Sequence, residues 1–268
     1  LYDFDTGKWR YFDDYRIHEL ATSQILDLDY KDDILLAGTR LGLSVFDMKD
    51  DRWRRFTVHD GLYDDVVRTV ALNDSIALTG TDFGVNIIDL NNWHVSRLRL
   101  TKEKTLLKIH KIKVAGDYFW IGTNNGIYAY DINTQTVRHF DFYGREVDVD
   151  KVIAADCHAI AAHGEHVVFK GNNFFMIHNM DTGDWENLPD YNYDSFVYEM
   201  DLEKDYLWLG TNAGVRLLNI KTGDWQKFEV VDGLAGHHVM EVFIDNNWVW
   251  FGTDRGLTKF NWRKYVLE

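Results

Sequence analysis

The chain has 268 residues, of which 46% are hydrophobic and 27% charged, so it can bury a core and is not a disordered polymer. Asp and Glu outnumber Lys and Arg by 43 to 29. The resulting net charge of -14 repels phosphate backbones, which argues against a nucleic-acid partner. The single cysteine, Cys157, excludes an internal disulfide and a zinc site built on several thiolates. No apolar run approaches the roughly 18 residues that span a bilayer, so no direct membrane insertion of this segment is expected.

The first twelve residues predict a short β-hairpin. Apolar and acidic residues are followed by Thr6-Gly7 and then by Trp9, a pattern typical of two strands that meet at a tight turn. The same pattern ends most of the longer units described next. Residues 1–12 are therefore expected to form half of a repeat unit.

A motif of Gly-Thr-x-x-Gly followed by an apolar residue recurs along the rest of the chain. The intact copies begin at Gly38, Gly80, Gly122, Gly210 and Gly252. With a degraded copy around Lys170-Gly171, six units follow one another at intervals of 42, 42, 48, 40 and 42 residues. Self-similarity of this length indicates a repeat architecture. The interval of 48 places a longer connection within residues 142–157.

Each unit reads as four short strands, which we call a, b, c and d. In the second unit they are expected over residues 67–72, 75–80, 84–89 and 93–98, where apolar and polar residues partly alternate. Turn residues such as Asn73-Asp74 and Gly116-Asp117 separate strands a and b. In the b–c turn we expect the second glycine of the motif to need a left-handed backbone. The threonine hydroxyl is expected to form a hydrogen bond within the same turn.

Four antiparallel strands in every ~42 residues are the signature of a β-propeller blade, whose faces are buried only by neighbouring blades. We therefore expect one all-β propeller domain over residues 1–268. The predicted repeats lie near 23–56, 66–98, 108–140, 158–188, 196–228 and 239–266, with the half-blade at 1–12. The leading half-blade favours a ring of seven positions, one of them incomplete. The alternative is a ring of six blades with the leading hairpin as an addition, since the last unit is assigned its own strands c and d over 256–265.

The motifs also resemble the two-component-regulator propeller repeats. That family places Asp-Gly-Leu before strand a and Trp-x-Gly-Thr-x-x-Gly-Leu over strands b and c. Matching segments are Asp60-Gly61-Leu62, Asp232-Gly233-Leu234, Trp120-Ile121-Gly122-Thr123, Trp208-Leu209-Gly210-Thr211 and Trp250-Phe251-Gly252-Thr253. The resemblance covers nearly the whole chain and departs from the pattern at Lys170, Gly171 and Phe174. It implies a sensor-type propeller from a bacterial extracytoplasmic regulator, and hence a periplasmic or extracellular location.

The d–a connections and b–c turns of a propeller share one end of the sheets, which is the usual binding surface. Their polar and aromatic side chains suit a polar small molecule or a glycan fragment, since tyrosine rings stack on sugars. The candidate ligand-binding residues are Arg40, Asp82, Asn124, Asn172, Asn212, Asp254, Arg255, Tyr15, His59, Tyr63, Tyr143, Tyr193 and His237. The same residue types also fill ordinary solvated turns, and that reading is the more frequent one for any single position.

Catalytic and metal-binding patterns are weak. His237 and His238 are adjacent, so strand alternation directs them to opposite faces and away from a shared ion. Carboxylate pairs such as Asp64-Asp65 could support acid–base chemistry, but so acidic a chain supplies such pairs by chance. No phosphate-binding or dinucleotide fingerprint occurs. We expect no catalytic residue, metal ligand or cofactor.

The function expected from the sequence is therefore a non-catalytic sensing or binding propeller. The alternatives are a protein-docking scaffold or dimerisation module, with a homodimer among its forms, and a propeller-type lyase or hydrolase.

Overall fold

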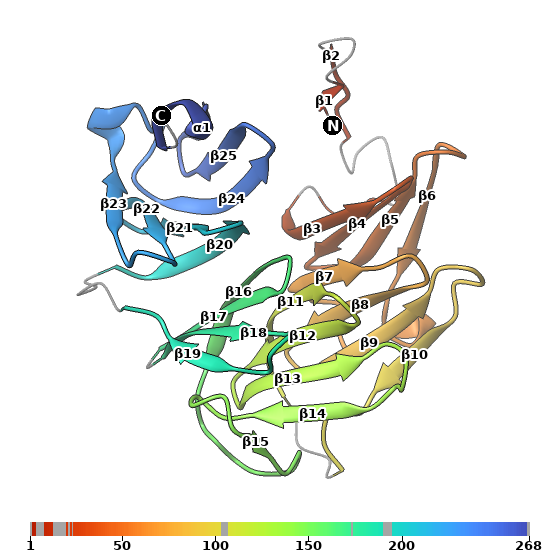
Figure 1. The fold of residues 1–268 in the computed structure, drawn as a ribbon. Helices are drawn as coiled ribbons and strands as arrows, with labels where there is room; N and C mark the ends of the chain where they lie inside the picture. Colours follow the sequence, from red (N-terminus) through yellow and green to blue (C-terminus); the bar gives the residue numbers. More distant parts are fainter. Residues whose placement is uncertain are drawn as a thin grey trace. The chain divides into compact units, whose positions relative to one another are not determined.

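The structure is a computed structural model that describes residues 2–3, 8–12, 20, 22, 24–102, 107–172, 174–189 and 195–266 (Figure 1). The chain divides into two compact units, Leu1–Ile112 and Lys113–Glu268. The elements of each unit are described in turn.

The first unit holds a two-stranded hairpin and two four-stranded antiparallel sheets. The hairpin consists of β1 (Tyr2–Asp3) and β2 (Lys8–Trp9). Sheet 1 consists of β3 (Ile25–Lys31), β4 (Ile34–Thr39), β5 (Gly42–Asp47) and β6 (Arg52–Phe56). Sheet 2 consists of β7 (Thr69–Leu72), β8 (Ile76–Thr81), β9 (Gly84–Asp89) and β10 (Val95–Leu98). The 3₁₀ turn η1 (Val58–Asp60) lies between the two sheets in sequence.

The boundary between the units falls inside β11 (Ile109–Ala115), the first strand of sheet 3. Sheet 3 continues with β12 (Tyr118–Thr123), β13 (Gly126–Asp131), β14 (Val137–Phe140) and β15 (Glu146–Val147). Sheet 4 contains β16 (Cys157–His163), β17 (His166–Gly171), β18 (Phe175–Asn179) and β19 (Trp185–Asn187). Sheet 5 contains β20 (Val197–Glu203), β21 (Tyr206–Thr211), β22 (Gly214–Asn219) and β23 (Trp225–Phe228). After η2 (Val230–Asp232), sheet 6 contains β24 (Val239–Asp245), β25 (Trp248–Thr253) and β26 (Gly256–Phe260), followed by helix α1 (Trp262–Val266).

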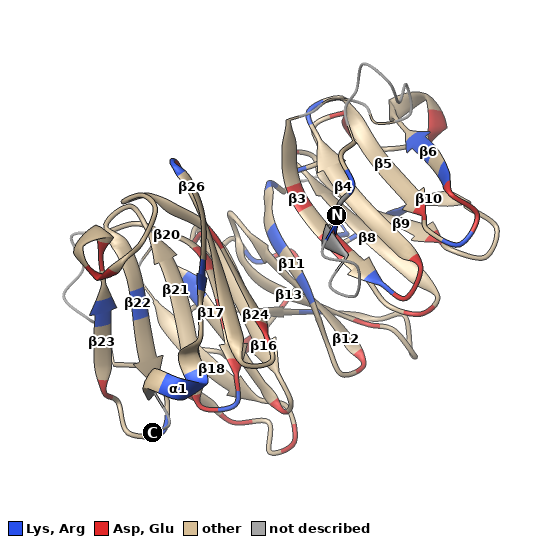
Figure 2. Cartoon of the chain, turned by 90° about the horizontal axis from the view of Figure 1, so that it is seen from above, with Lys and Arg blue, Asp and Glu red and all other residues tan. Residues whose placement is uncertain are grey.

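This series of repeated antiparallel sheets confirms the predicted fold class, an all-β propeller with six blades. Strand b is an inner strand of each sheet and carries no charged residue in β4, β8, β12, β21 and β25. Figure 2 shows β4, β8, β12 and β21 as tan strands. Aromatic rings fill the space between sheets 3 and 4, where Trp120 is 1% exposed and packs against Phe169 and Trp185. Large apolar rings therefore hold adjacent sheets together.

The two glycines of each repeat motif have different roles. The second has a positive φ, such as +89° at Gly214, as the b–c turn was predicted to require. The first allows close approach, because a Cβ at Gly210 would lie 2.6 Å from the carbonyl oxygen of Val239 in the next sheet. The motif threonine forms the predicted bonds: Thr211 Oγ1 donates to Gly214 O at 2.8 Å and accepts from Ala213 N–H at 3.0 Å. The motif thus stabilises its own turn and lets the backbone of the next sheet approach closely.

The prediction of strand d at the end of the last repeat was wrong. Residues Trp262–Val266 form helix α1, and sheet 6 has three strands among the described residues. Trp262 was taken for the tryptophan of strand d, but it aligns with Ile220, in the c–d turn of the preceding repeat. Its ring is 1% exposed, and its indole N–H donates to Asn246 O at 3.1 Å. None of the helices in the described part of the chain is both long and apolar enough to cross a membrane.

Candidate functional site

The b–c turn residues that we predicted as ligand contacts hold the framework together. Asp82 receives two hydrogen bonds of 2.6 Å from the guanidinium of Arg68. These bonds hold the pKa of the Asp82 carboxyl below its usual range. Asp82 is therefore half of a bidentate ion pair on its own sheet.

Three further b–c residues fasten the segment that leads into strand a of the same sheet. Asn212 exchanges two bonds with the backbone of Phe196, at 2.9 and 3.1 Å. Asp254 does the same with His238, at 3.2 and 3.0 Å. Asn172 donates from its side chain to Asp156 at 2.9 Å. These side chains close the b–c end of each sheet on itself.

The other predicted residues differ in how exposed their side chains are. Tyr63 is half-buried, and the guanidinium of Arg97 lies 4.6 Å from its ring centroid. Tyr143 is 57% exposed, with the guanidinium of Arg145 at 4.8 Å. The remaining described candidates are exposed, and they are Arg40, His59, Asn124, His237 and Arg255. Tyr15 and Tyr193 lie outside the described residues. Ligand binding by this set stays a prediction.

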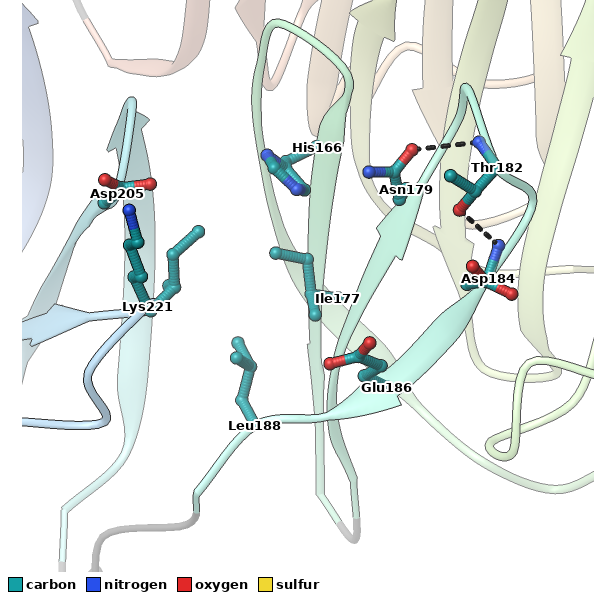
Figure 3. Close-up of a pocket in the computed structure, with 10 residues that line it drawn as sticks. His166, Ile177, Asn179, Thr182, Asp184, Glu186, Leu188, Asp205 and Lys221 are labelled. Atoms are coloured by element: carbon teal, nitrogen blue, oxygen red, sulfur yellow. Dashed lines mark hydrogen bonds between the residues drawn. The ribbon is translucent and has the colours of Figure 1, made fainter.

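A cavity of about 420 Å³ opens at the opposite end of the sheets, between sheets 4 and 5 in the second unit (Figure 3). The a–b and c–d turns meet at this end because successive strands are antiparallel. The residues that line it are His166, Ile177, Asn179, Thr182, Asp184, Glu186, Leu188, Asp205, Ile220 and Lys221. None of them belongs to the predicted set.

The c–d turn of sheet 4 forms one wall of this cavity and is internally rigid. Asn179 Oδ1 accepts the N–H groups of Asp181 and Thr182 at 2.9 and 3.0 Å. Thr182 Oγ1 accepts the N–H of Asp184 at 3.3 Å, and Figure 3 shows both kinds of bond on the wall. Such side-chain-to-backbone bonds fix a turn without a regular ladder.

The lining combines an apolar floor with an acidic rim. Ile177 and Leu188 are buried and Ile220 is half-buried, so the floor is a continuation of the core between the two sheets. The charged groups of the lining are three carboxylates, of Asp184, Glu186 and Asp205, and one ammonium, of Lys221. The lining therefore carries net negative charge, and it suits a ligand that donates hydrogen bonds through hydroxyl or ammonium groups.

Sequence reasoning missed this cavity because it followed the family's usual binding end. The available signal was the sequence Thr-Gly-Asp that the c–d turns of sheets 4 and 5 share, in Asp181-Thr182-Gly183-Asp184 and Lys221-Thr222-Gly223-Asp224. A strand pattern alone does not report which adjacent turns enclose a space.

The structure also defines the chemistry of the one thiol. Cys157 is fully buried, and burial raises the pKa of its thiol, so a nucleophilic thiolate is disfavoured there. No cluster of three or more His, Cys, Asp or Glu residues within the described ranges has the arrangement of a metal site.

The fold and the cavity together define a β-propeller built from repeats, with a polar pocket between two of its sheets. The chain resembles the extracellular domain of BT4673, a putative one-component system from B. thetaiotaomicron, with TM-score 0.71 and 18% identity over 89% of this chain and 32% of that one. It also resembles PorZ, a surface component of the type-IX secretion system of Porphyromonas gingivalis, with TM-score 0.61 and 12% identity over 89% of this chain and 33% of that one. A third similar structure is YCF48 bound to D1 peptide, with TM-score 0.64 and 14% identity over 89% of this chain and 78% of that one.

The chain thus spans about a third of the BT4673 domain that it matches. No protein-family model matches the sequence, and no curated protein matches it. The likeness is one of fold.

Proposed function

We propose that this chain is a non-catalytic recognition module that binds a small polar ligand in the cavity between sheets 4 and 5. The carrying observation is that three carboxylates and a lysine line a cavity between two sheets together with apolar side chains of the core. A ligand with hydroxyl or ammonium groups on one side and an apolar ring or chain on the other fits that lining. The module works outside the cytoplasm, as a sensing part of a regulator.

Two further observations support this function. Four polar residues at the b–c end, Asp82, Asn172, Asn212 and Asp254, form hydrogen bonds with the framework, and the thiol is buried. The similar BT4673 structure is described as the extracellular domain of a putative sensing system. A rigid scaffold lowers the entropic cost of binding, because the lining side chains are held in place before the ligand arrives.

Calorimetric titration with a panel of polyamines, amino sugars and neutral monosaccharides tests the proposal. We expect at least one amine-bearing class to bind, and Asp205→Asn or Glu186→Gln to weaken that binding at least tenfold. Asp181→Asn is the matched control, since Asp181 is an exposed carboxylate in the same turn that does not line the cavity. Binding that survives both lining variants, or the absence of binding by every class, would refute the proposed site.

A further inference from the structure

Sheet 3 has a fifth strand, which no other sheet has among the described residues. This strand, β15, comes from the longer connection that follows β14, and it pairs antiparallel with β14 so that Glu146 lies opposite Phe140 (Figure 1). The outer side of an edge strand carries N–H and C=O groups that have no strand partner. β15 supplies that partner for part of β14, so sheet 3 shows how a strand d of this fold can be extended.

An ion pair joins the fifth strand to strand d. Arg138 on β14 donates from Nε and Nη2 to Glu146 Oε2, at 3.0 and 2.7 Å. Arg138 stands two residues before Phe140, which lies opposite Glu146, so the two charged side chains are diagonal neighbours on one face of the sheet. An acidic residue on the added strand and an arginine on strand d therefore act together with the backbone pairing.

Sheet 1 has the same arginine but lacks the fifth strand. In β6, Arg54 stands two residues before Phe56, and the register with strand c makes it the counterpart of Arg138. β6 is the last strand in the order β3-β4-β5-β6, so its outer side has no strand partner among the described residues. The counterparts of Arg54 in sheets 2, 4 and 5 are Ser96, Glu186 and Gln226. Of the five d strands that the structure describes, only those of sheets 1 and 3 have a basic residue at this position.

The arginines on this face of β6 have no acidic partner. The guanidinium carbon of Arg54 lies 4.9 Å from the ring centroid of Trp93, and its Nε has no hydrogen-bond partner. Arg52, on the same face, is exposed. Neither arginine forms an ion pair with a carboxylate in the part of the chain that the structure describes. Arg54 therefore has the donors that Arg138 uses for Glu146, without the acceptor.

The nearby carboxylates are engaged elsewhere. Asp47 lies opposite Arg52 on β5, but its Oδ1 accepts two backbone N–H groups of the following turn, each at 3.1 Å. Asp51 forms an ion pair with Arg10. β6 itself has three arginines and no acidic residue in Arg52–Phe56. In a chain of net charge -14, this edge is a local cluster of positive charge.

We propose that β6 binds an acidic, extended segment of a partner protein as a fifth strand, antiparallel to β6, in the way that β14 binds β15. A carboxylate opposite Phe56 reaches Arg54, and a second carboxylate two residues later, opposite Arg54, reaches Arg52. Backbone hydrogen bonds supply the affinity, and the two carboxylates supply the specificity. The chain's own fifth strand has the same spacing, since acidic and branched residues alternate from Glu146 to Asp150.

Two observations favour a protein strand over another anion. The edge of β6 presents backbone groups without a strand partner among the described residues, and a polysaccharide or a nucleic acid cannot match them with a regular ladder. Sheet 3 shows the corresponding edge occupied by a polypeptide, with the corresponding arginine as its ionic contact. A sulfated polysaccharide would be attracted by the arginines alone, so its binding is the competing explanation that the experiment separates.

Fluorescence polarisation with the labelled peptide Glu-Val-Asp-Val-Asp-Val tests the proposal on the complete 268-residue chain. We expect the peptide to bind, and Arg54→Gln to weaken that binding at least tenfold. Lys49→Gln is the matched control, because it removes one exposed positive charge from the same sheet outside β6. Arg52→Gln, at an exposed position, should weaken binding at least threefold, and it provides an independent variant if circular dichroism shows that Arg54→Gln does not fold.

Hydrogen exchange and a methylated peptide distinguish strand addition from charge attraction. The peptide should slow amide exchange within Arg52–Phe56, and dextran sulfate of equal charge should not. The same peptide methylated at alternate backbone nitrogens keeps its carboxylates but cannot pair with a strand, so its affinity should fall at least tenfold. Absence of binding by the unmodified peptide, equal affinity of the methylated peptide, or equal affinity of both arginine variants and the wild type would overturn the proposal.

Discussion

Asp27 on β3 accepts a hydrogen bond of 2.9 Å from the backbone N–H of Val70 on β7, the first strand of the next sheet. The same relation recurs between Asp29 and Leu72, Thr69 and Ile112, and Asp201 and Ile244, always 43 residues apart in sequence. Strand a is an edge strand, so its outward N–H groups have no strand partner. A side chain from the preceding sheet satisfies them.

Removing Asp27 should destabilise the first unit strongly. Its other oxygen lies 3.2 Å from Lys111 Nζ, and both side chains of this ion pair are less than a tenth exposed. Asp27→Ala leaves a buried ammonium without this carboxylate, which costs about 3–5 kcal/mol. Urea unfolding measures the loss.

Two variants separate the charge effect from a packing effect. Asp33→Ala, at an exposed position, should leave the unfolding free energy nearly unchanged. The double variant Asp27→Leu/Lys111→Met should recover the part of the loss that is due to the unpaired ammonium, because neither charge of the pair then remains, whereas the hydrogen bond of Val70 N–H stays lost. A double variant as unstable as Asp27→Ala would contradict this account.

Asp201 should make stability fall as the pH rises. Burial raises the pKa of its carboxyl, against the opposing effects of Lys113 and of the N–H groups of Ile244 and Leu202. A folded pKa above the unfolded one means that the folded state binds the proton more tightly. The associated stability is present at acid pH, below the unfolded pKa, and is lost as the pH rises through the folded pKa.

Asp201→Asn mimics the protonated carboxyl and keeps an oxygen for Ile244 N–H. Its unfolding free energy relative to the wild type should therefore be higher at pH 7 than at pH 3.5 or so. Thermal or urea unfolding at the two pH values provides the measurement. An equal difference in unfolding free energy at the two pH values would show that burial does not disfavour the charged form of Asp201.

Gly210→Ala and Gly252→Ala form a matched pair. A methyl group at Gly210 would overlap Val239 O, and such overpacking costs about 1–3 kcal/mol. At Gly252 the nearest atom to such a methyl group is Glu241 Cβ of the same sheet, at 3.1 Å, so the loss of stability should be much smaller. Equal losses of unfolding free energy would mean that the first motif glycine is required by the backbone of its own strand and not by the close approach of the next sheet.

Thr211→Val tests the turn bonds of the repeat motif. The change removes one donated and one accepted hydrogen bond inside a buried turn, which costs about 1–3 kcal/mol. Thr253→Val removes the same pair of bonds at an exposed turn, where water replaces them, so the loss should be smaller. Chemical denaturation of both variants gives the comparison. A larger loss at Thr253 would contradict the role of burial.

Most of the local structure was predictable because it depends on residues close in sequence. The c strand of the second repeat was expected over 84–89 and is observed over Gly84–Asp89. The left-handed glycine and the bonding threonine of each b–c turn followed from the motif. Strand d of the last repeat was mispredicted, because Trp262 was aligned with the tryptophan position of strand d.

The candidate site was much less predictable. Asn212 and Asp254 were suitable ligand contacts by residue type, yet their side chains bind the backbone of their own sheets. The acidic lining formed by Asp184, Glu186 and Asp205 comes from two repeats, and no local pattern reports that their turns adjoin.

The amino-acid order by itself determined the strand pattern, the turns and the repeat, because hydrogen bonds within a hairpin and apolar alternation involve neighbours along the chain. Only the tertiary structure decided which polar groups form hydrogen bonds with the framework and which adjacent turns line a cavity. Those outcomes depend on contacts between neighbouring sheets. Such contacts join residues far apart in sequence, as Asp27 and Val70 do at a separation of 43 positions.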